Sequence, residues 1–89
     1  MHPQRTPLRP LPPEQVSLGR AVRWRRAYTG ISQEELGFRS ALHRNYIGAI
    51  ERGQINPTLR TLLKVANGLG IAVSELIRLY EQVAAETAR

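Results

Sequence analysis

Apolar residues recur along this chain mostly at the three- and four-residue spacing of an amphipathic helix. Glycines and short polar runs interrupt this pattern and divide the chain into five predicted helices. The predicted helices span residues 14–27, 33–39, 43–52, 57–69 and 75–85. No segment shows the sustained alternation of apolar and polar residues that is typical of a β-strand. The sequence therefore predicts one small all-α domain.

Local signals predict where these helices begin and end. Gly30 follows the first helix, as glycine commonly does just past a helix end. Ser32 and Glu35 form the pattern of a capping box, in which two side chains satisfy free amides at the start of a helix. Asn56 and Pro57 are expected to start the fourth helix as its N-cap and its first residue. The predicted apolar face of that helix contains Leu59, Leu62, Leu63, Ala66 and Leu69.

Positive charge is concentrated in the first two thirds of the chain. The 89 residues include 13 lysines and arginines and seven acidic residues, which gives a net charge of +6. Residues 1–60 contain ten arginines and four glutamates and carry all of this charge, whereas residues 61–89 contain three basic and three acidic residues and carry none. Such a balance favours a polyanionic partner, with nucleic acid ahead of anionic lipid. The arginines are spread over several short helices, which argues against a helix that lies on a membrane surface.

Composition excludes several other classes of protein. The chain has no cysteine, which excludes disulfides and thiolate zinc sites, and its two histidines make a histidine metal site improbable. No Ser/His/Asp set, phosphate-binding loop or dinucleotide fingerprint is present, so we expect neither an enzyme nor a cofactor. No apolar run reaches the roughly 18–20 residues of a membrane helix, and no signal peptide is recognisable. We therefore expect a cytoplasmic protein, associated with the nucleoid when it is bound to DNA.

The N-terminal segment differs in composition from the rest of the chain. Five of the six prolines lie in residues 1–13. Proline lacks an amide donor and disrupts helices and central strands, so this segment is predicted to be a disordered or polyproline-like tail. It carries Arg5 and Arg9, and it is either an unstructured leader or a basic arm that contacts DNA phosphates. Residues 14–89 are expected to form the folded domain.

Three motifs resemble one family of DNA-binding domains. They are GISQEEL at residues 30–36, YIGAIERG at 46–53 and NPTL at 56–59. At these spacings they resemble the Cro/cI-type (XRE) domains over about residues 18–77. The resemblance implies a five-helix lambda-repressor-like fold with a helix-turn-helix at the second and third helices, and the function of a sequence-specific transcriptional regulator that binds double-stranded DNA. A weaker similarity at residues 43–48 is to restriction–modification controller proteins.

The third predicted helix contains the candidate residues for base recognition. In this type of fold it enters the major groove with its N-terminal residues over the base edges. Here those residues are His43, Arg44 and Asn45, with Ala49 one turn later. Arg44 can pair with guanine and Asn45 with adenine, while Ala49 can contact a thymine methyl group. The alternative for Arg44 and Asn45 is a solvated polar face, and His43 can equally serve as a helix cap or contact a phosphate.

Residues around this helix are candidates for contacts with DNA phosphates. Gln33 lies at the N-terminus of the second helix, where backbone amides attract phosphate, and in the family it often braces the first base-reading residue. Arg60 and the loop residues Gln54 and Asn56 are expected to contact the next phosphates, although a capping role explains Asn56 better. Arg39 is a further candidate. An ordinary solvated side chain is the alternative for both Gln33 and Arg39.

The resemblance also implies structural roles. Arg26 and Glu51 are expected to form a partly buried ion pair between the first and third helices, and loss of one partner is expected to cost about 3–5 kcal/mol if the pair is buried. Gly37 departs from the family pattern because it lies inside a helix where alanine is usual, at a cost of about 1 kcal/mol of helix propensity. Ala41 stands at a turn position that usually holds glycine and often has positive φ.

The last predicted helix continues beyond what a compact five-helix domain needs. Leu76, Leu79, Tyr80 and Val83 are expected to form a homodimer interface, and such dimers bind half-sites about 34 Å apart in a palindromic site. The alternative is that Tyr80 and Val83 fold back onto the first helix and Trp24. A second possible function is that of an antitoxin-like or partner-binding regulator, which binds another protein through this apolar helix.

Overall fold

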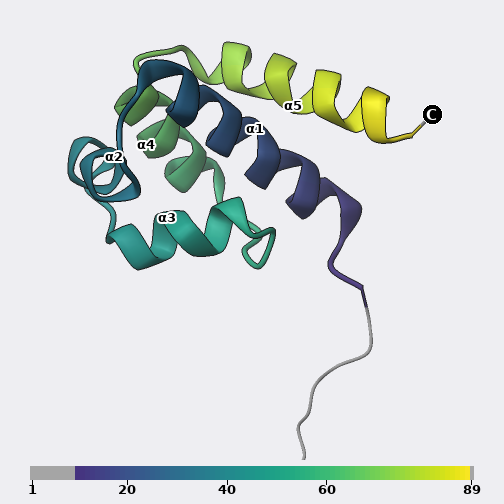
Figure 1. Ribbon diagram of the computed structural model, residues 1–89, viewed down its shortest axis with the longest axis horizontal. Helices are drawn as coiled ribbons and strands as arrows, with labels where there is room; N and C mark the ends of the chain where they lie inside the picture. The colour runs from purple at the N-terminus through teal and green to yellow at the C-terminus, as the bar shows by residue number, and fades with distance from the viewer. Residues whose placement is uncertain (1–9, 89) are drawn as a thin grey trace, which may run out of the picture.

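The computed structural model describes residues 10–88, which form five α-helices and contain no strand (Figure 1). The helices are α1 (Pro13–Thr29), α2 (Gln33–Ser40), α3 (Arg44–Glu51), α4 (Leu59–Leu69) and α5 (Val73–Thr87). The predicted all-α fold and the order of its helices are therefore confirmed, with α2 and α3 as the helix-turn-helix pair. None of the described helices is both long and apolar enough to cross a membrane.

Helix α1 begins one residue earlier than predicted, because Pro13 is its first residue. Proline is tolerated there, since an amide in the first turn has no partner within the helix. At the other end Gly30 has a φ of 77°, and its amide donates to the carbonyl of Arg26 at 3.0 Å. Residues 1–9 of the predicted tail, which include Arg5 and Arg9, lie outside the described residues.

Only half of the predicted capping box at the start of α2 is present. Ser32 Oγ accepts a hydrogen bond from the amide of Glu35 at 2.9 Å. The Glu35 carboxylate instead accepts a hydrogen bond from Arg39 Nε at 2.8 Å. Arg39 lies four residues later on the same face of the helix and competes for this carboxylate. The reciprocal bond from Glu35 to Ser32 was therefore a wrong prediction.

The start of α4 also differs from the prediction. Thr58 is the N-cap residue, and its hydroxyl accepts a hydrogen bond from the amide of Thr61 at 3.2 Å. Asn56 and Pro57 therefore precede the helix, and their predicted roles as N-cap and first residue are wrong. A threonine hydroxyl satisfies a free amide of the first turn much as an asparagine side chain does, so the helix can begin two residues later.

Helix α4 carries apolar side chains on its buried face and also on part of its exposed face. The core takes the face that contains Leu62, Val65, Ala66 and Leu69. Leu59 and Leu63, which the periodicity also assigned to the buried face, remain 67% and 49% exposed. The neighbouring helices cover one side of α4, and these two leucines lie on the uncovered side. We call them the exposed α4 strip.

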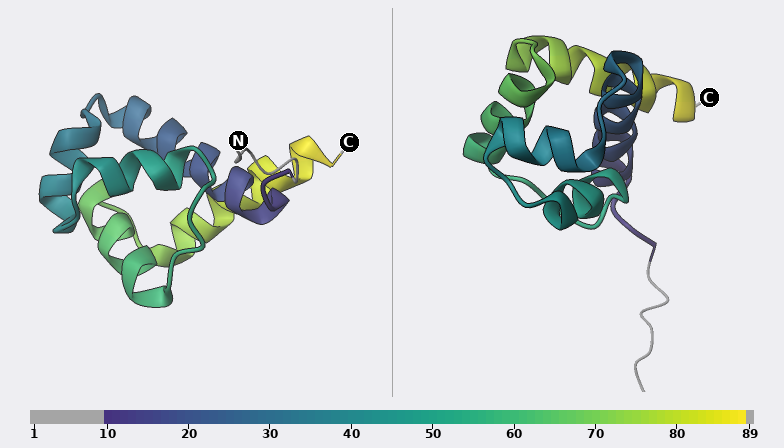
Figure 2. Two further views of the ribbon diagram at one scale, coloured as in Figure 1. Left: turned by 90° about the horizontal axis from the view of Figure 1, so that it is seen from below. Right: turned by 60° about the vertical axis from the view of Figure 1, so that its left-hand side comes forward.

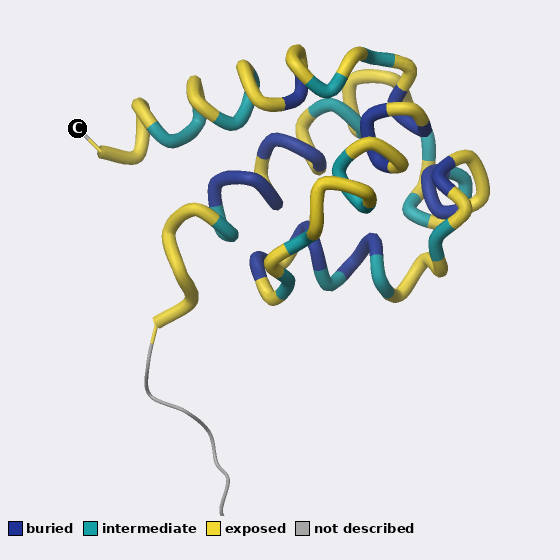
Figure 3. Tube along the Cα trace, turned by 180° about the vertical axis from the view of Figure 1, so that it is seen from behind, coloured by how far each residue is buried: buried dark blue, intermediate teal, exposed yellow. Residues whose placement is uncertain are grey.

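One hydrophobic core joins all five helices. Buried residues are dark blue in Figure 3. The buried members of this core are Leu18, Val22, Leu36, Ile47, Ile50, Val65, Ala66, Leu69 and Leu76. Burial of a side chain of this size stabilises the fold by about 1.5–3 kcal/mol. Leu76 has no exposed surface, so it cannot form part of the predicted dimer interface. The core holds α2 and α3 at a defined angle to the rest of the domain.

Helix α1 lies between α3 on one side and α5 on the other (Figures 1 and 2). Near the start of α1, Ser17 and Tyr80 line one shallow hollow between α1 and α5. Further along α1, Trp24 and Val83 line a second hollow between these two helices. Tyr80 and Val83 are half-buried, so α5 folds back onto α1, which is the alternative to the dimer interface. Trp24 also stacks on Tyr28, with ring centroids 5.5 Å apart.

The turn between α2 and α3 accounts for two unusual residues. Ala41 has the left-handed conformation, with φ 57° and ψ 40°, as the family pattern implies for this position. The turn also brings the Leu42 carbonyl against α2. A Cβ atom on Gly37 would lie 2.6 Å from that oxygen and 3.2 Å from the Arg44 nitrogen. Because this is too close for a methyl group, the turn requires the glycine inside α2.

Candidate nucleic-acid interface

Helix α3 is anchored by one face and presents the other to solvent. Ile47 and Ile50 are buried in the core, and Tyr46 is half-buried against it. Arg44 and Asn45, at the N-terminal end of the helix, are exposed. The apolar residues therefore hold α3 in place, while its first turn leaves polar groups available to a ligand.

His43 is the N-cap residue of α3, which begins one residue later than predicted. Its Nδ1 accepts a hydrogen bond from the amide of Asn45 at 3.0 Å. A ring nitrogen that accepts carries no proton, so the neutral ring has its proton on Nε2. The capping role that was one alternative for His43 is therefore present. The ring is exposed, and its Nε2–H group remains available as a donor.

The exposed polar side chains on α3 make only weak contacts within the protein. Arg44 Nη1 lies 3.9 Å from Glu34 Oε2, and these two side chains are 61% and 77% exposed. An exposed ion pair of this kind contributes about 0–1 kcal/mol, so a ligand can replace Glu34 at little cost. No hydrogen bond within residues 10–88 uses the side-chain amide of Asn45. Ala49 is half-buried and adds only a methyl group to this surface.

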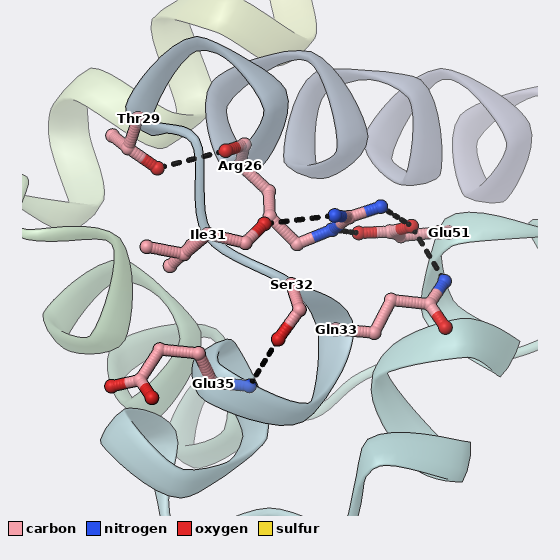
Figure 4. Close-up of polar contacts among 7 residues, drawn as sticks. All are labelled: Arg26, Thr29, Ile31, Ser32, Gln33, Glu35 and Glu51. Carbon is pink, nitrogen blue, oxygen red and sulfur yellow. Dashed lines mark hydrogen bonds and ion pairs between the residues drawn. The ribbon is translucent and has the colours of Figure 1, made fainter.

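Arg26 and Glu51 form the ion pair that the family resemblance implies (Figure 4). Arg26 donates through Nε and Nη2 to the two carboxylate oxygens of Glu51 at 2.6 and 3.0 Å, and through Nη1 to the carbonyl of Ile31 at 3.0 Å. The hydrogen bond to Glu51 raises the pKa of Arg26; burial opposes this shift, and attraction to the carboxylate adds to it. Arg26 thus ties α1 to α3 and is structural.

Gln33 joins the same network, and it does not brace Arg44. Its Nε2 donates to Glu51 Oε1 at 2.9 Å, so Gln33 and Arg26 share one carboxylate (Figure 4). Its side-chain oxygen lies 3.5 Å from the point that a Cβ atom on Gly48 would occupy. In the free protein Gln33 therefore positions the start of α2 against α3.

The four other candidates for phosphate contacts lie on the surface. Arg39, Gln54, Asn56 and Arg60 are all exposed. Arg39 is paired with Glu35, and Gln54 accepts a hydrogen bond from Arg52 Nε at 3.2 Å. Asn56 lies in the loop before α4, and Arg60 is in the first turn of that helix.

Arg52 is an exposed basic residue at the C-cap of α3 that received no role from the sequence. The sequence signal that could have identified Arg52 is its spacing from Asn45. Arg52 follows Asn45 by seven residues, which is close to two helical turns, so the two side chains leave α3 on the same side. The candidate interface therefore extends along α3 beyond its first turn.

Comparisons of this chain with known proteins, by sequence and by structure, agree with one another. Residues 22–76 match a family model described as helix-turn-helix. Control protein C.SmaI of Serratia marcescens is 43% identical over 60 residues, which are 67% of this chain and 71% of that protein. The restriction–modification controller protein C.AhdI of Aeromonas hydrophila is 44% identical, with a TM-score of 0.69 over 71% of this chain and 96% of that chain.

A second similar structure includes DNA. The controller protein C.Esp1396I was solved as a tetramer in complex with its natural 35-base-pair operator. It is 25% identical to this chain, with a TM-score of 0.76 over 81% of this chain and 95% of that one.

Proposed function

Because the chain belongs to the helix-turn-helix family of DNA-binding transcription regulators and is not an enzyme, we propose that it binds a palindromic operator as a homodimer. In this proposal α3 lies in the major groove of double-stranded DNA. The bound protein regulates transcription of nearby genes. The complex of C.Esp1396I with its operator supports the same class of ligand. Because the proposed ligand is DNA, we also propose that the protein acts in the cytoplasm.

The division of α3 into a buried and an exposed face is the observation that carries this proposal. Ile47 and Ile50 are buried, and the exposed first turn presents Arg44 and Asn45 with their hydrogen-bonding groups free or only weakly paired. These two side chains match guanine and adenine in the major groove. His43 can donate through Nε2, and Ala49 can contact a thymine methyl group.

Contacts with the DNA backbone supply the part of the affinity that does not depend on sequence. The residues that we propose for these contacts are Gln33, Arg39, Gln54, Asn56 and Arg60. Arg39 must exchange its exposed partner Glu35 for a phosphate, which costs little because both side chains are in water. Binding is therefore expected to weaken steeply as the salt concentration rises.

For the dimer interface we propose apolar side chains that one chain leaves exposed. The exposed α4 strip, Leu59 and Leu63, lies on a helix that packs against α5, where Ile77 is 36% exposed. Ile77 and Tyr80 line a hollow that also reaches the loop before α4. Leu79 and Val83 line a hollow together with Trp24 of α1 and lie at the margin of this interface, and Leu76 is excluded by its burial.

Selection of bound sequences from a random duplex library, at stated salt, tests the DNA ligand and its symmetry together. We expect a palindromic consensus with half-sites about one helical turn apart. Absence of any enrichment above random DNA would refute sequence-specific binding. Enrichment of a site without a repeated half would refute the homodimer but not the DNA ligand.

The interface is tested separately by sedimentation of L63E. Leu63 is half-exposed, so the charge is expected to weaken self-association and leave the fold intact. F38E is the matched control, because Phe38 is an 83% exposed apolar residue on α2. If both variants sediment like the wild-type dimer, the proposed interface is wrong.

A further inference from the structure

Arg52 belongs to the same surface as the base-reading residues but lies at the opposite end of α3. It follows Asn45 by seven residues, which corresponds to about 10 Å along the helix axis. The N-terminal end of a recognition helix lies over the bases. The C-terminal end of α3 is therefore expected to lie near the edge of the groove, where the sugar-phosphate backbone runs.

The Arg52 side chain is held in one orientation by two neighbours. Its Nε donates to Gln54 Oε1 at 3.2 Å, which fastens it on the loop side. Its Nη1 lies over Gly48, only 2.9 Å from the point that a Cβ atom on Gly48 would occupy. Gly48 therefore leaves room for the guanidinium to lie back along α3, and any larger residue would push it away.

The charge of Arg52 is not neutralised within the described part of the chain. Arg26, Arg39 and Arg44 each have a carboxylate within 4.0 Å, whereas Arg52 has none among residues 10–88. Arg52 is exposed, so its guanidinium has donors directed to solvent. A guanidinium of this kind is well suited to a phosphate, which it can bind with two parallel hydrogen bonds.

We propose that Arg52 is a DNA-backbone contact, and that Gly48 and Gln54 position its guanidinium for a phosphate at the edge of the major groove. This inference rests on the proposed function, since it names a further residue of the same interface. It also assigns a reason for the glycine inside α3. A cation at the C-terminal end of a helix can stabilise the helix by itself, so the test must separate stability from binding.

The first test is R52Q, measured by fluorescence anisotropy on the selected duplex and on a random duplex, each at several salt concentrations. We expect a loss of about tenfold in affinity on both duplexes, and a log–log salt slope that is smaller by about 1. The matched control is R78Q, which removes an exposed arginine from α5, on the far side of α1 from α3 (Figure 1). The control is expected to keep the wild-type slope.

Each outcome of this test has a separate meaning. An unchanged slope and affinity for R52Q would overturn the proposal, and so would a loss confined to the selected duplex, which indicates base recognition. If R52Q and R78Q lose affinity equally, the effect is one of net charge and the proposal fails. Failure of the wild-type protein to bind either duplex would instead refute the proposed function.

The positioning role of Gly48 is tested by a double-mutant cycle. G48A is expected to fold, because the atom nearest to the added methyl group is the end of a flexible side chain, and thermal unfolding checks this. We expect G48A to weaken DNA binding in the wild-type background and to have no further effect in R52Q. Equal losses in both backgrounds would overturn the positioning role.

Discussion

E51Q removes one buried charge with almost no change in volume, and it tests whether the network at the α1–α3 interface holds the domain together. The Glu51 carboxylate accepts three hydrogen bonds, two from Arg26 and one from Gln33. Its side chain is only 1% exposed, so water cannot replace a lost partner. A glutamine at this position offers one acceptor oxygen and a donor amide, which leaves at least one donor facing another donor.

The expected loss of stability in E51Q follows from the burial of the ion pair. Loss of one partner of a buried ion pair costs about 3–5 kcal/mol. Arg26 is 16% exposed and keeps its hydrogen bond to the Ile31 carbonyl, so we expect the lower end of this range, about 3 kcal/mol. A domain of this size is stable by roughly 4–12 kcal/mol, and the variant therefore loses a large part of that stability.

The chain contains a matched control on α2. Arg39 and Glu35 form an ion pair at 2.8 Å, but these two side chains are 52% and 44% exposed. E35Q makes the same chemical change in water, where an i,i+4 pair contributes only about 0.3–0.5 kcal/mol.

Urea unfolding followed by far-UV circular dichroism measures both variants. All proteins must be compared at one concentration, because the stability of a dimer depends on its concentration. Equal losses for E51Q and E35Q, or a loss below about 1 kcal/mol for E51Q, would refute the argument from burial. The double variant R26M/E51L is expected to recover part of the loss, because it leaves no unpaired buried charge.

Three further predictions address the turn and the DNA-facing residues. A41G is expected to raise the free energy of unfolding by about 0.5–1 kcal/mol, because it relieves the left-handed alanine against the larger unfolded-state freedom of glycine; a lower urea midpoint would contradict this. H43S is expected to keep the N-cap and near-wild-type stability, whereas H43A is expected to lose about 1 kcal/mol of unfolding free energy. Equal thermal midpoints for H43A and the wild-type protein would show that the cap contributes nothing. R44A is expected to cost about 1–3 kcal/mol of binding on the selected duplex and to relax one base position, whereas R60A weakens all duplexes alike. Equal losses for R44A on selected and random DNA would exclude its role in base recognition.

Prediction from the sequence succeeds where neighbouring residues decide the structure. Gly30 ends α1 and Ser32 caps α2, because the groups that satisfy a helix end lie within a few residues of it. The anchoring residues Ile47 and Ile50 follow from helical spacing alone. The pair of Arg26 and Glu51 lies 25 residues apart, and it was predicted only because the motifs resemble a family in which the pair is known.

Prediction fails where two groups compete for one partner. The Glu35 carboxylate could bond either the Ser32 amide or Arg39, and Arg39 is its partner in the folded chain. Asn56 and Thr58 could each cap α4, and Thr58 does so. In both cases the local pattern allows two arrangements of similar energy, so small differences in backbone path decide between them.

The sequence by itself determined five helices, a basic N-terminal part and the residues at the start of α3. Only the tertiary structure decided which apolar side chains are buried. Leu63 and Leu76 both fit a helical apolar face, yet Leu63 is 49% exposed and Leu76 is in the core. The tertiary structure also brought the side-chain amide of Gln33 to Glu51, 18 residues further along the chain. Helical periodicity is a property of one segment, whereas burial and side-chain position depend on which other segments pack against it, and those contacts join residues that lie far apart in the chain.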